Sequence, residues 1–375
     1  MADPRVEKLA KLVVNYSVRC KKGDMIMIRA PPVAEPLVLE MYREIIRAGG
    51  HPVMNMSPER TQEIFYEEAK DHQLNFLSPY SKFLYENLDG LIGISADSNT
   101  RALSGVDSKK IAKTSAANRP LHDIFSKRGY VGAKHELKWC GLAYPTNGLA
   151  QEASMSLTEY EDFVYGACLV DRKDPIAEWK KVSKSQEGMV KYLNKVDKLE
   201  FYGEDTELKM SVKGKVWVNS DGKHNMPSGE VFSAPVQGKV DGHIRFTYPG
   251  IYMGKEIEDI TLHFKKGKVV KATAAKGQDL LRTLLAIDDG AKQLGEVAIG
   301  TNTGIKQFTK KILFDEKLGG TIHMAIGSEY MDCMGTTKSI NKSAIHWDII
   351  KDMKSGGEIY ADGILIYKNG KWLMQ

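Results

Sequence analysis

The sequence predicts an α/β amino-terminal domain with a mostly parallel sheet, followed by an α+β, strand-rich carboxy-terminal domain. In the first half, short apolar runs alternate with stretches of helical spacing, which is typical of a wrapped parallel sheet. Beyond about residue 196, short strand-like runs are separated by Gly, Asp-Gly and Lys-Gly turns, as in antiparallel hairpins. A chain of 375 residues is long for one core, so we expect two domains, 1–195 and 196–375.

The sequence of the first half predicts helices and strands that alternate along the chain. Apolar runs that read as strands lie at 24–31, 51–57, 88–97 and 138–146. Helical spacing before and between them covers 6–18, 34–50, 60–71 and 73–88. The pair Gly49-Gly50 closes the second of these helices, because glycine is favoured just past a helix end. Residues 147–196 then read as helical and lead into the second half.

The second half is dominated by hairpin patterns. Strand-like runs continue from residue 198 to about 275, a helix is expected at 277–290, and the last twenty residues read as one more set of hairpins. This change of rhythm is the reason for placing the domain boundary near residue 195.

Composition and charge exclude several classes of protein. The net charge of +5 comes from 53 basic and 48 acidic residues that are scattered, which disfavours nucleic-acid binding. No apolar run approaches the ~18–20 residues needed to span a bilayer, and the amino terminus reads as an amphipathic helix and not as a signal peptide. The four cysteines lie far apart, without a CxxC pair. We therefore expect a soluble cytoplasmic protein without membrane or nucleic-acid partners.

Nucleotide-binding motifs are missing where they would be expected. A dinucleotide fold would carry GxGxxG between the first strand and the next helix, but that junction reads "RAPPVAEP". A GxxxxGK[ST] motif is also absent. Phosphate binding by the first half is therefore disfavoured.

The segment "SAIHWDII" (343–350) places charge in apolar surroundings. In a strand, the period of two puts His346 and Asp348 on one face and Trp347 and Ile349 on the other. A solvent-facing edge would explain this pattern, and so would a pair of side chains that bind the same ligand.

Four further residues interrupt apolar segments of the second half in the same way. They are Glu230 in "MPSGEVFSAP", Glu296 in "LGEVAIGTN", and Glu316 and His323 in "ILFDEKLGGTIHMAIG". Taken singly, such a glutamate is more often a surface residue, and such a histidine is more often a satisfied core residue. All of them interrupt apolar segments of the same domain, and this shared pattern indicates a common site.

Together the six side chains resemble the ligand set of a metal centre. Oxygen and imidazole ligands without thiolates suit Zn, Mn or Co. Four carboxylates carry −4, which two divalent cations would balance with neutral imidazoles, as in two-metal hydrolytic sites. The chain has no HExxH motif, which disfavours a single-zinc protease site on a helix.

Tyr330 lies seven residues beyond His323, in "IGSEYMD". It can be a packed aromatic ring with an accessible hydroxyl group. It can also be a phenol that donates to the oxyanion when water adds to a carbonyl.

The four segments that carry these residues resemble the signature stretches of the M29 metalloaminopeptidases, the aminopeptidase T and aminopeptidase S group. The resemblance extends over the whole chain, and "IIRAGGHPV" in the first half fits it too. It implies the metal ligands Glu230, Glu296, Glu316, His323, His346 and Asp348, and an active-site tyrosine at Tyr330. Some relatives have a shorter "DEN" link between the third glutamate and the histidine, where this chain has "DEKLGGTIH".

The resemblance implies removal of the N-terminal residue from peptides by water activated between two divalent cations, Zn or Co, with Mn as a third option. Glu230 or Glu296 would carry the proton from the water to the leaving amine, and Tyr330 would stabilise the intermediate. It also implies broad activity with a preference for hydrophobic residues such as Leu, a peptide partner with a free N-terminus, and a homodimer.

Two other functions fit the residues themselves. The first is another dinuclear metal hydrolase, an amidohydrolase or a phosphoesterase, with the same kinds of ligands. The second is a non-enzymatic α/β ligand-binding protein whose carboxylates are surface features. Hydrolysis of a blocked N-acyl peptide would favour the first, and purification without tightly bound metal would favour the second.

Overall fold

The structure is a computed structural model that describes residues 3–130, 132–337 and 340–374. It has two compact units, one made of residues 1–176 with 222–227 and the other of residues 177–221 with 228–375. The predicted fold class is confirmed: the first unit has a parallel sheet with helices, and the second is rich in antiparallel strands. The expected boundary at residues 195 and 196 remains a prediction about which segments fold independently.

The first unit contains a five-stranded sheet in the order β2-β1-β3-β4-β8, and all its neighbouring strands are parallel. The strands are β1 (Met25–Ala30), β2 (His51–Met56), β3 (Gly90–Ser95), β4 (Lys138–Ala143) and β8 (Asn225–Met226). The helices are α1 (Pro4–Leu12), which continues into the π-helix Val13–Ser17, α2 (Glu35–Arg47), α3 (Arg60–Glu68), α4 (Asp71–Leu74), α5 (Pro79–Asn87), α6 (Ser108–Ala117), α7 (Arg119–Arg128), α8 (Asn147–Glu152) and α9 (Leu157–Ala167).

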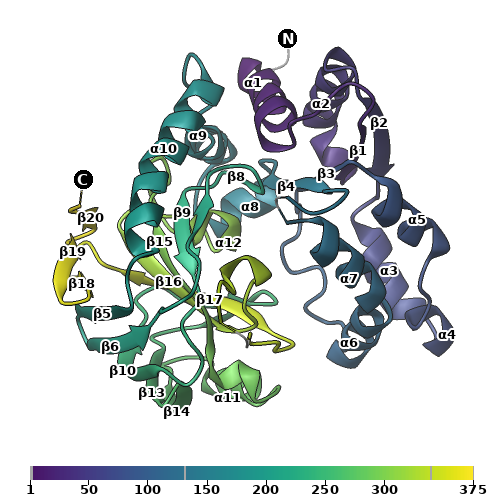
Figure 1. The fold of residues 1–375 in the computed structure, drawn as a ribbon. Coiled ribbons are helices and arrows are strands. Elements are labelled where there is room, and N and C mark those ends of the chain that lie inside the picture. Colours follow the sequence, from purple (N-terminus) through teal and green to yellow (C-terminus); the bar gives the residue numbers. More distant parts are fainter. Residues whose placement is uncertain (1–2, 131, 338–339, 375) are drawn as a thin grey trace. The chain divides into compact units, whose positions relative to one another are not determined.

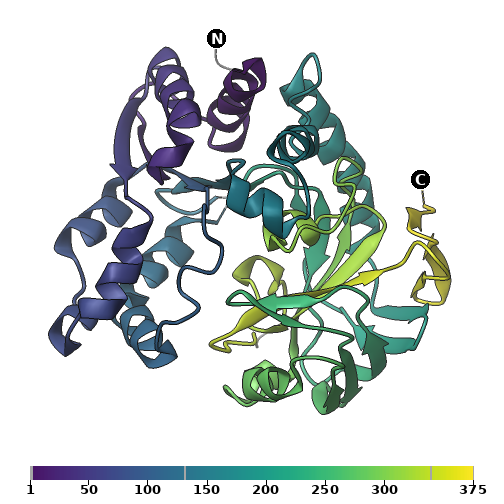
Figure 2. The same cartoon turned by 180° about the vertical axis from the view of Figure 1, so that it is seen from behind.

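Helices flank this sheet on both faces, as the views from the front and from behind show (Figures 1 and 2). Helix α2 packs against β1 and β2, while Leu84 of α5 joins Met27 of β1 in an apolar cluster. The segment 73–88, which we predict as one helix, is two helices, because Ser78 caps α5 and Pro79 occupies its first position. Strand β8 comes from the second half of the sequence and pairs with β4.

The second unit contains helices α10 (Pro175–Leu193), α11 (Gln278–Leu285) and α12 (Ile312–Asp315). Its strands are β5 (Lys198–Gly203), β6 (Thr206–Ser211), β7 (Val218–Ser220), β9 (Glu230–Ser233), β10 (Val240–Arg245), β11 (Gly250–Tyr252), β12 (Lys255–Ile257), β13 (Thr261–Lys265), β14 (Lys268–Thr273), β15 (Leu294–Gly300), β16 (Thr321–Gly327), β17 (His346–Asp352), β18 (Glu358–Ala361), β19 (Ile364–Lys368) and β20 (Lys371–Trp372).

These strands form an eight-stranded sheet, a five-stranded sheet and the hairpin β11-β12. The larger sheet has the order β14-β13-β10-β6-β5-β18-β19-β20, so the carboxy-terminal strands lie beside β5 (Figure 1). The smaller sheet has the order β17-β16-β15-β9-β7, with every pair antiparallel. One apolar cluster contains residues of both sheets and of α10 and α11.

The two faces of the five-stranded sheet differ sharply. Alternate residues such as Val297, Met324 and Ile349 face the apolar cluster and are buried in it. The residues between them, including Glu296 and His323, belong to the opposite face, because successive side chains of a strand point to opposite sides. This second face carries the candidate site.

None of the helices in the described ranges combines the length and the hydrophobicity that a membrane crossing requires.

Candidate metal centre

The six predicted ligands come from four strands and one helix end of the second unit. Glu230 begins β9, Glu296 lies in β15, Glu316 directly follows α12, His323 lies in β16, and His346 and Asp348 lie in β17. The period-two prediction for β17 is confirmed, because its two ligand candidates share a face and converge with Glu296. The longer link between Glu316 and His323 also allows both residues to reach this site.

Residues without bulky side chains leave space between these groups. Ala325 is the strand partner of both Glu296 and Asp348, and Ala298 is the partner of His323. Glycines lie opposite two other candidates: Gly300 pairs with Glu230, and Gly327 pairs with His346. The charged side chains therefore meet mostly across small residues, and Ile350, the β17 partner of His323, is the exception among these strand pairs.

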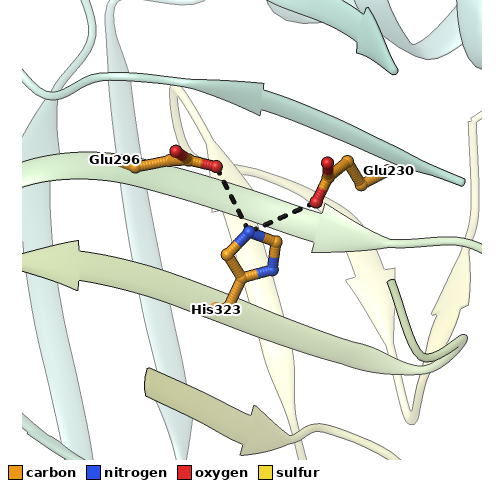
Figure 3. A group of neighbouring side chains, drawn as sticks. All are labelled: Glu230, Glu296 and His323. Atoms are coloured by element: carbon orange, nitrogen blue, oxygen red, sulfur yellow. Dashed lines mark hydrogen bonds and ion pairs between the residues drawn. The ribbon is translucent and has the colours of Figure 1, made fainter. Parts of the chain in front are cut away.

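The ring of His323 lies between the carboxylates of Glu296 and Glu230 (Figure 3). The Nε2 atom of His323 is 3.2 Å from Glu296 Oε1 and 3.3 Å from Glu230 Oε2. The Nε2 atom of His346 is 3.3 Å from Glu296 Oε2 and 3.5 Å from Asp348 Oδ2. Each oxygen of Glu296 thus faces a different imidazole, so this carboxylate links the two histidines.

The candidate ligands form three overlapping trios. Within each trio, one ligand atom of every residue lies within 4.8 Å of the others. The trios are Glu230, Glu296 and His323; Glu296, His346 and Asp348; and Glu316, His323 and Asp348. All six predicted residues are included, and Glu296, His323 and Asp348 each belong to two trios.

Several buried polar atoms of the cluster fit a cation. Within the described ranges, Asp348 Oδ1 has no hydrogen-bond partner, and Glu230 Oε2 has only a contact of 3.3 Å with His323 Nε2, an atom that also faces Glu296. Leaving a buried polar group unsatisfied costs ~1–3 kcal/mol, so these two carboxylate oxygens are a reason to expect a ligand. Carboxylate oxygens and imidazole nitrogens are the ligands that divalent Zn, Co and Mn accept.

Charge compensation perturbs the ionisation of these groups. Burial disfavours the charged form of His323, but Glu296 and Glu230 outweigh it and raise its pKa to about 9. For Asp348, burial is outweighed by His346, and the pKa falls to about 2. Burial raises the pKa of Glu316 to about 7. Protons on the imidazoles therefore compensate the carboxylates where a cation would otherwise do so.

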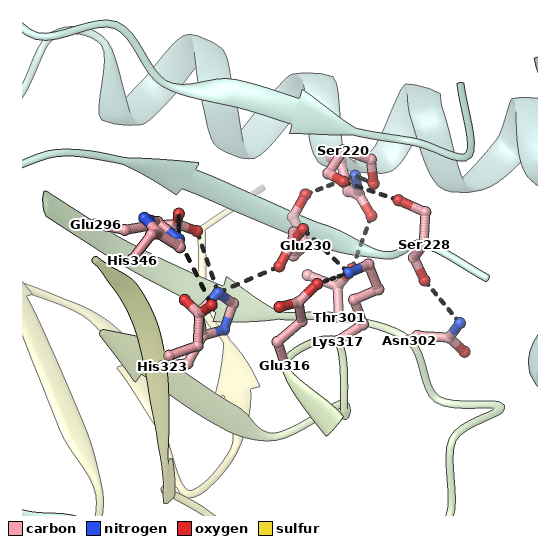
Figure 4. A network of polar contacts seen from close by, with 12 residues as sticks. Ser220, Ser228, Glu230, Glu296, Thr301, Asn302, Glu316, Lys317, His323 and His346 are labelled. Atoms are coloured by element: carbon pink, nitrogen blue, oxygen red, sulfur yellow. Dashed lines mark hydrogen bonds and ion pairs between the residues drawn. The ribbon is translucent and has the colours of Figure 1, made fainter. Parts of the chain in front are cut away.

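Lys317 is a member of this cluster that the sequence analysis missed (Figure 4). Its side chain is completely buried, its Nζ atom contacts Glu316 Oε1, and it lies 3.6 Å from Glu230 Oε1. Burial opposes the charged form of Lys317, but Glu230 and Glu316 outweigh it and hold its pKa above the ordinary value. A lysine next to Glu316 in "DEKLGG" resembles any surface ion pair, so only the fold reveals its position.

Polar groups behind the ligands orient them. Gln186 of α10 donates from Nε2 to the backbone oxygen of Glu230 and accepts from the Thr301 hydroxyl through Oε1. His346 donates from Nδ1 to the carbonyl of Ser328 at 2.7 Å. That bond fixes the ring so that Nε2 faces the centre, as is usual for metal-binding histidines.

Tyr330 lies beside the cluster, with its ring centroid 4.8 Å from that of His346. Its side chain is half-exposed and also contacts Phe232. Partial burial beside the carboxylates of Glu296 and Asp348 raises the pKa of the phenol well above its usual value. The group therefore stays protonated and can donate a hydrogen bond near neutral pH.

An apolar pocket of about 180 Å³ adjoins the cluster. His346 and Asp348 form part of its wall. The rest of the wall is mostly apolar and comes from three segments: Pro249, Ile251, Tyr252 and Met253; Phe308, Ile312 and Asp315; and Trp347 and Ile350. A ligand held at the cluster can therefore place an apolar group here.

Comparisons with known proteins agree on one family. The family described as "Thermophilic metalloprotease (M29)" matches residues 2–372. Aminopeptidase AmpS of Bacillus subtilis is 29% identical, with 98% of each chain covered. Aminopeptidase T of Thermus thermophilus is 26% identical, also with 98% of each chain covered.

Solved structures support the same fold. AmpT from Thermus thermophilus superposes with a TM-score of 0.85 over 99% of each chain, at 23% identity. A 2,5-dihydroxypyridine dioxygenase from Pseudomonas putida has a TM-score of 0.56 at 11% identity, so the fold alone does not fix the chemistry. The family match, which covers nearly the whole chain, identifies the class of enzyme. This chain belongs to the M29 metalloproteases and is an aminopeptidase, a hydrolase that acts on peptides.

Proposed function

We propose that this aminopeptidase removes the N-terminal residue from peptides with two divalent cations, Zn or Co with Mn as a third option. The proposed ligands are Glu230, Glu296, Glu316, His323, His346 and Asp348. The observation that supports this most is the overlap of the three ligand trios, since shared carboxylates are typical of two-metal sites. When bound, the cations would polarise the scissile carbonyl and make a hydroxide available near neutral pH.

The chain's own carboxylates would move the proton from the attacking water to the leaving amine. We assign this role to Glu230 or Glu296, the two glutamates that face His323. Metal content distinguishes their roles: Glu→Gln at a glutamate that serves only as a ligand lowers bound metal and activity together, whereas Glu→Gln at the proton carrier lowers activity far more than it lowers bound metal.

Tyr330 would donate a hydrogen bond to the oxyanion that forms on the carbonyl oxygen. Its protonated phenol beside His346 supports this role. We expect Tyr330→Phe to lower kcat by about 10²–10³, the usual cost of losing one oxyanion donor, with metal content unchanged. An unchanged kcat would remove Tyr330 from the mechanism.

The apolar pocket supports a preference for hydrophobic N-terminal residues such as Leu, within a broad activity. Ile251 lies in its wall, so Ile251→Trp should fill the pocket and lower kcat/KM for Leu and Phe p-nitroanilides far more than for the Ala substrate. Equal losses for all three substrates would indicate that the pocket does not hold the substrate side chain.

Metal analysis of the purified enzyme tests the two-cation proposal directly. We expect two equivalents per chain after equilibration with Zn or Co, loss of Leu-p-nitroanilide hydrolysis on chelation, and recovery with Zn or Co. N-acetyl-Leu-p-nitroanilide serves as the control, because an aminopeptidase needs the free amine and should not cleave it. Fewer than two equivalents in the fully active enzyme would contradict the proposal.

We further propose that the protein is a cytoplasmic homodimer. The four cysteines are free thiols, which suits a reducing compartment. Helix α2 exposes Leu39, Tyr42 and Ile46 along one side, and exposed apolar stripes of this kind often mark protein interfaces. Elution at 41.8 kDa, the mass of one chain, in size-exclusion chromatography would contradict the dimer.

A further inference from the structure

Three lysines of the described ranges are buried, and they differ in what they contact. Lys351 donates from Nζ to the backbone oxygens of Glu204 and Arg245, both at 3.0 Å. Lys215 forms one ion pair with Glu329, at 2.5 Å. Lys317 instead contacts two carboxylates, Glu230 and Glu316, and both belong to the candidate ligand trios.

The backbone holds Lys317 in this position from both sides. Its amide donates to the carbonyl of Phe314, and its own carbonyl accepts from the amide of Asn302, each at 3.0 Å. The amide of Gly319 bonds to the carbonyl of Asn302, also at 3.0 Å. The ammonium group therefore belongs to the built site and is not a mobile surface charge.

A fixed ammonium group changes the charge balance of the centre. Four carboxylates carry −4, so two divalent cations with neutral imidazoles would balance them without any lysine. With Lys317 present, the carboxylates and the ammonium carry −3, so two divalent cations are balanced only when a hydroxide binds with them. The second cation to enter is therefore repelled by a charge that the chain itself supplies, in a buried place where charges are poorly screened.

We propose that Lys317 is a positioning residue that holds Glu230 and Glu316 in the metal-free centre and weakens the cation bound by Glu316, His323 and Asp348. One of the two cations is then held tightly and the other exchanges readily. This inference rests on the two-cation function proposed above. It assigns to Lys317 a role in metal affinity and in the stability of the metal-free protein, and no role in proton transfer.

Titration of the metal-free protein with Zn²⁺ or Co²⁺ tests this role. We expect Lys317→Met to bind the second equivalent at least about tenfold more tightly than the wild type, because one buried positive charge is gone. The Tm of metal-free Lys317→Met should fall, because Glu230 and Glu316 then repel each other, and the gain in Tm on metal loading should grow.

Lys351→Met is the matched control, because it removes a buried ammonium group that faces backbone oxygens. It should lower the Tm of the metal-free and the loaded protein equally and leave both metal affinities unchanged. Equal losses of Tm in the metal-free and the loaded Lys317→Met protein would overturn the role of Lys317. An unchanged or weaker affinity for the second equivalent of cation would overturn it too.

A second variant covers the case in which Lys317→Met does not fold. Lys317→Met combined with Glu316→Gln removes one charge of each sign and should recover the Tm of the metal-free protein. No recovery would mean that Lys317 acts through packing alone.

The wild type separates this inference from the function on which it rests. Fewer than two equivalents at millimolar cation would overturn the two-cation function. Two equivalents with the same affinities in the wild type and in Lys317→Met would overturn only the role of Lys317.

Discussion

The two five-stranded sheets of this protein differ in the kinds of side chain that they bury. In the parallel sheet of the first unit, the buried side chains of the strands are apolar, as with Ile28 of β1 and Ile92 of β3. In the antiparallel sheet of the second unit, one face is equally apolar, but Glu296 and His323 are buried in the middle of the other.

The difference shows which sheet is built for stability and which for chemistry. A charged group costs several kcal/mol to bury unless partners compensate it. The first sheet keeps its Asp24–Lys138 ion pair beside β1 and at the start of β4, where neither side chain is completely buried. The second sheet gathers carboxylates and imidazoles where burial is greatest, an arrangement that stability alone would not favour.

The largest expected effect comes from moving charge into the first sheet. Ile92→Glu places a carboxylate in a fully buried position without an ammonium or imidazole designed to meet it, and should cost more than about 4 kcal/mol of unfolding free energy. Urea unfolding followed by hydrogen exchange in β1 and β3 measures this loss. Ile92→Val, which removes one methylene group, should cost only ~1 kcal/mol. A well-folded Ile92→Glu protein would break the contrast between the two sheets.

A smaller effect on stability but a large one on activity is expected for Glu296→Gln. The amide keeps the shape of the side chain, so the fold should survive, while activity should fall more than about 100-fold with the loss of a charged ligand. Kinetics with Leu-p-nitroanilide and a urea titration measure the two effects. Glu44→Gln is the control, since Glu44 is a buried glutamate that pairs with Arg47 at 2.5 Å, and its activity should be unchanged. Wild-type activity of Glu296→Gln would contradict the proposed role of Glu296.

The smallest expected effect lies in the eight-stranded sheet, where charge has no catalytic use. His263 stacks on His243 at 5.4 Å and faces Lys271 across the strands. Partial burial, Lys271 and His243 together lower the pKa of His263. At His263 the folded state therefore binds fewer protons than the unfolded state between this lowered pKa and the ordinary value near 6.5, so the contribution of His263 to stability rises with pH in that interval.

A series of urea midpoints between pH 5 and pH 7.5 in the wild type and in His263→Gln measures this contribution as the difference between the two slopes, because Glu316 and His323, whose pKa values are raised, add slopes of the opposite sign to both proteins. The slope should be less positive in His263→Gln than in the wild type, because the side chain no longer titrates. The same slope in both proteins would place the pH dependence elsewhere.

Much of this contrast could be read from the sequence. Alternating helices and strands predicted the parallel sheet, and the interruption of apolar runs by Glu230, Glu296, His323, His346 and Asp348 predicted a cluster that the structure brings together. Both predictions rest on local patterns. Within the strands, the period of two assigns each residue to one face of the sheet.

Other features depend on contacts between distant segments. The pairing of β8 with β4 joins residues more than eighty positions apart, and no local sequence pattern predicts it. The burial of Lys317 depends on the turn after α12, and the apolar pocket is assembled from segments that are separated in sequence. Helices α6 and α7 have no fully buried residue, which explains why their apolar spacing was too weak to predict them.

The small residues between the ligands have a consequence for protein engineering. Ala298 and Ala325 occupy positions where a valine would fit the strand and add buried hydrocarbon. A design protocol that rewards packing would fill these places and score each change as an improvement. The resulting protein would gain buried hydrocarbon at the site and lose the space that the proposed cations would occupy.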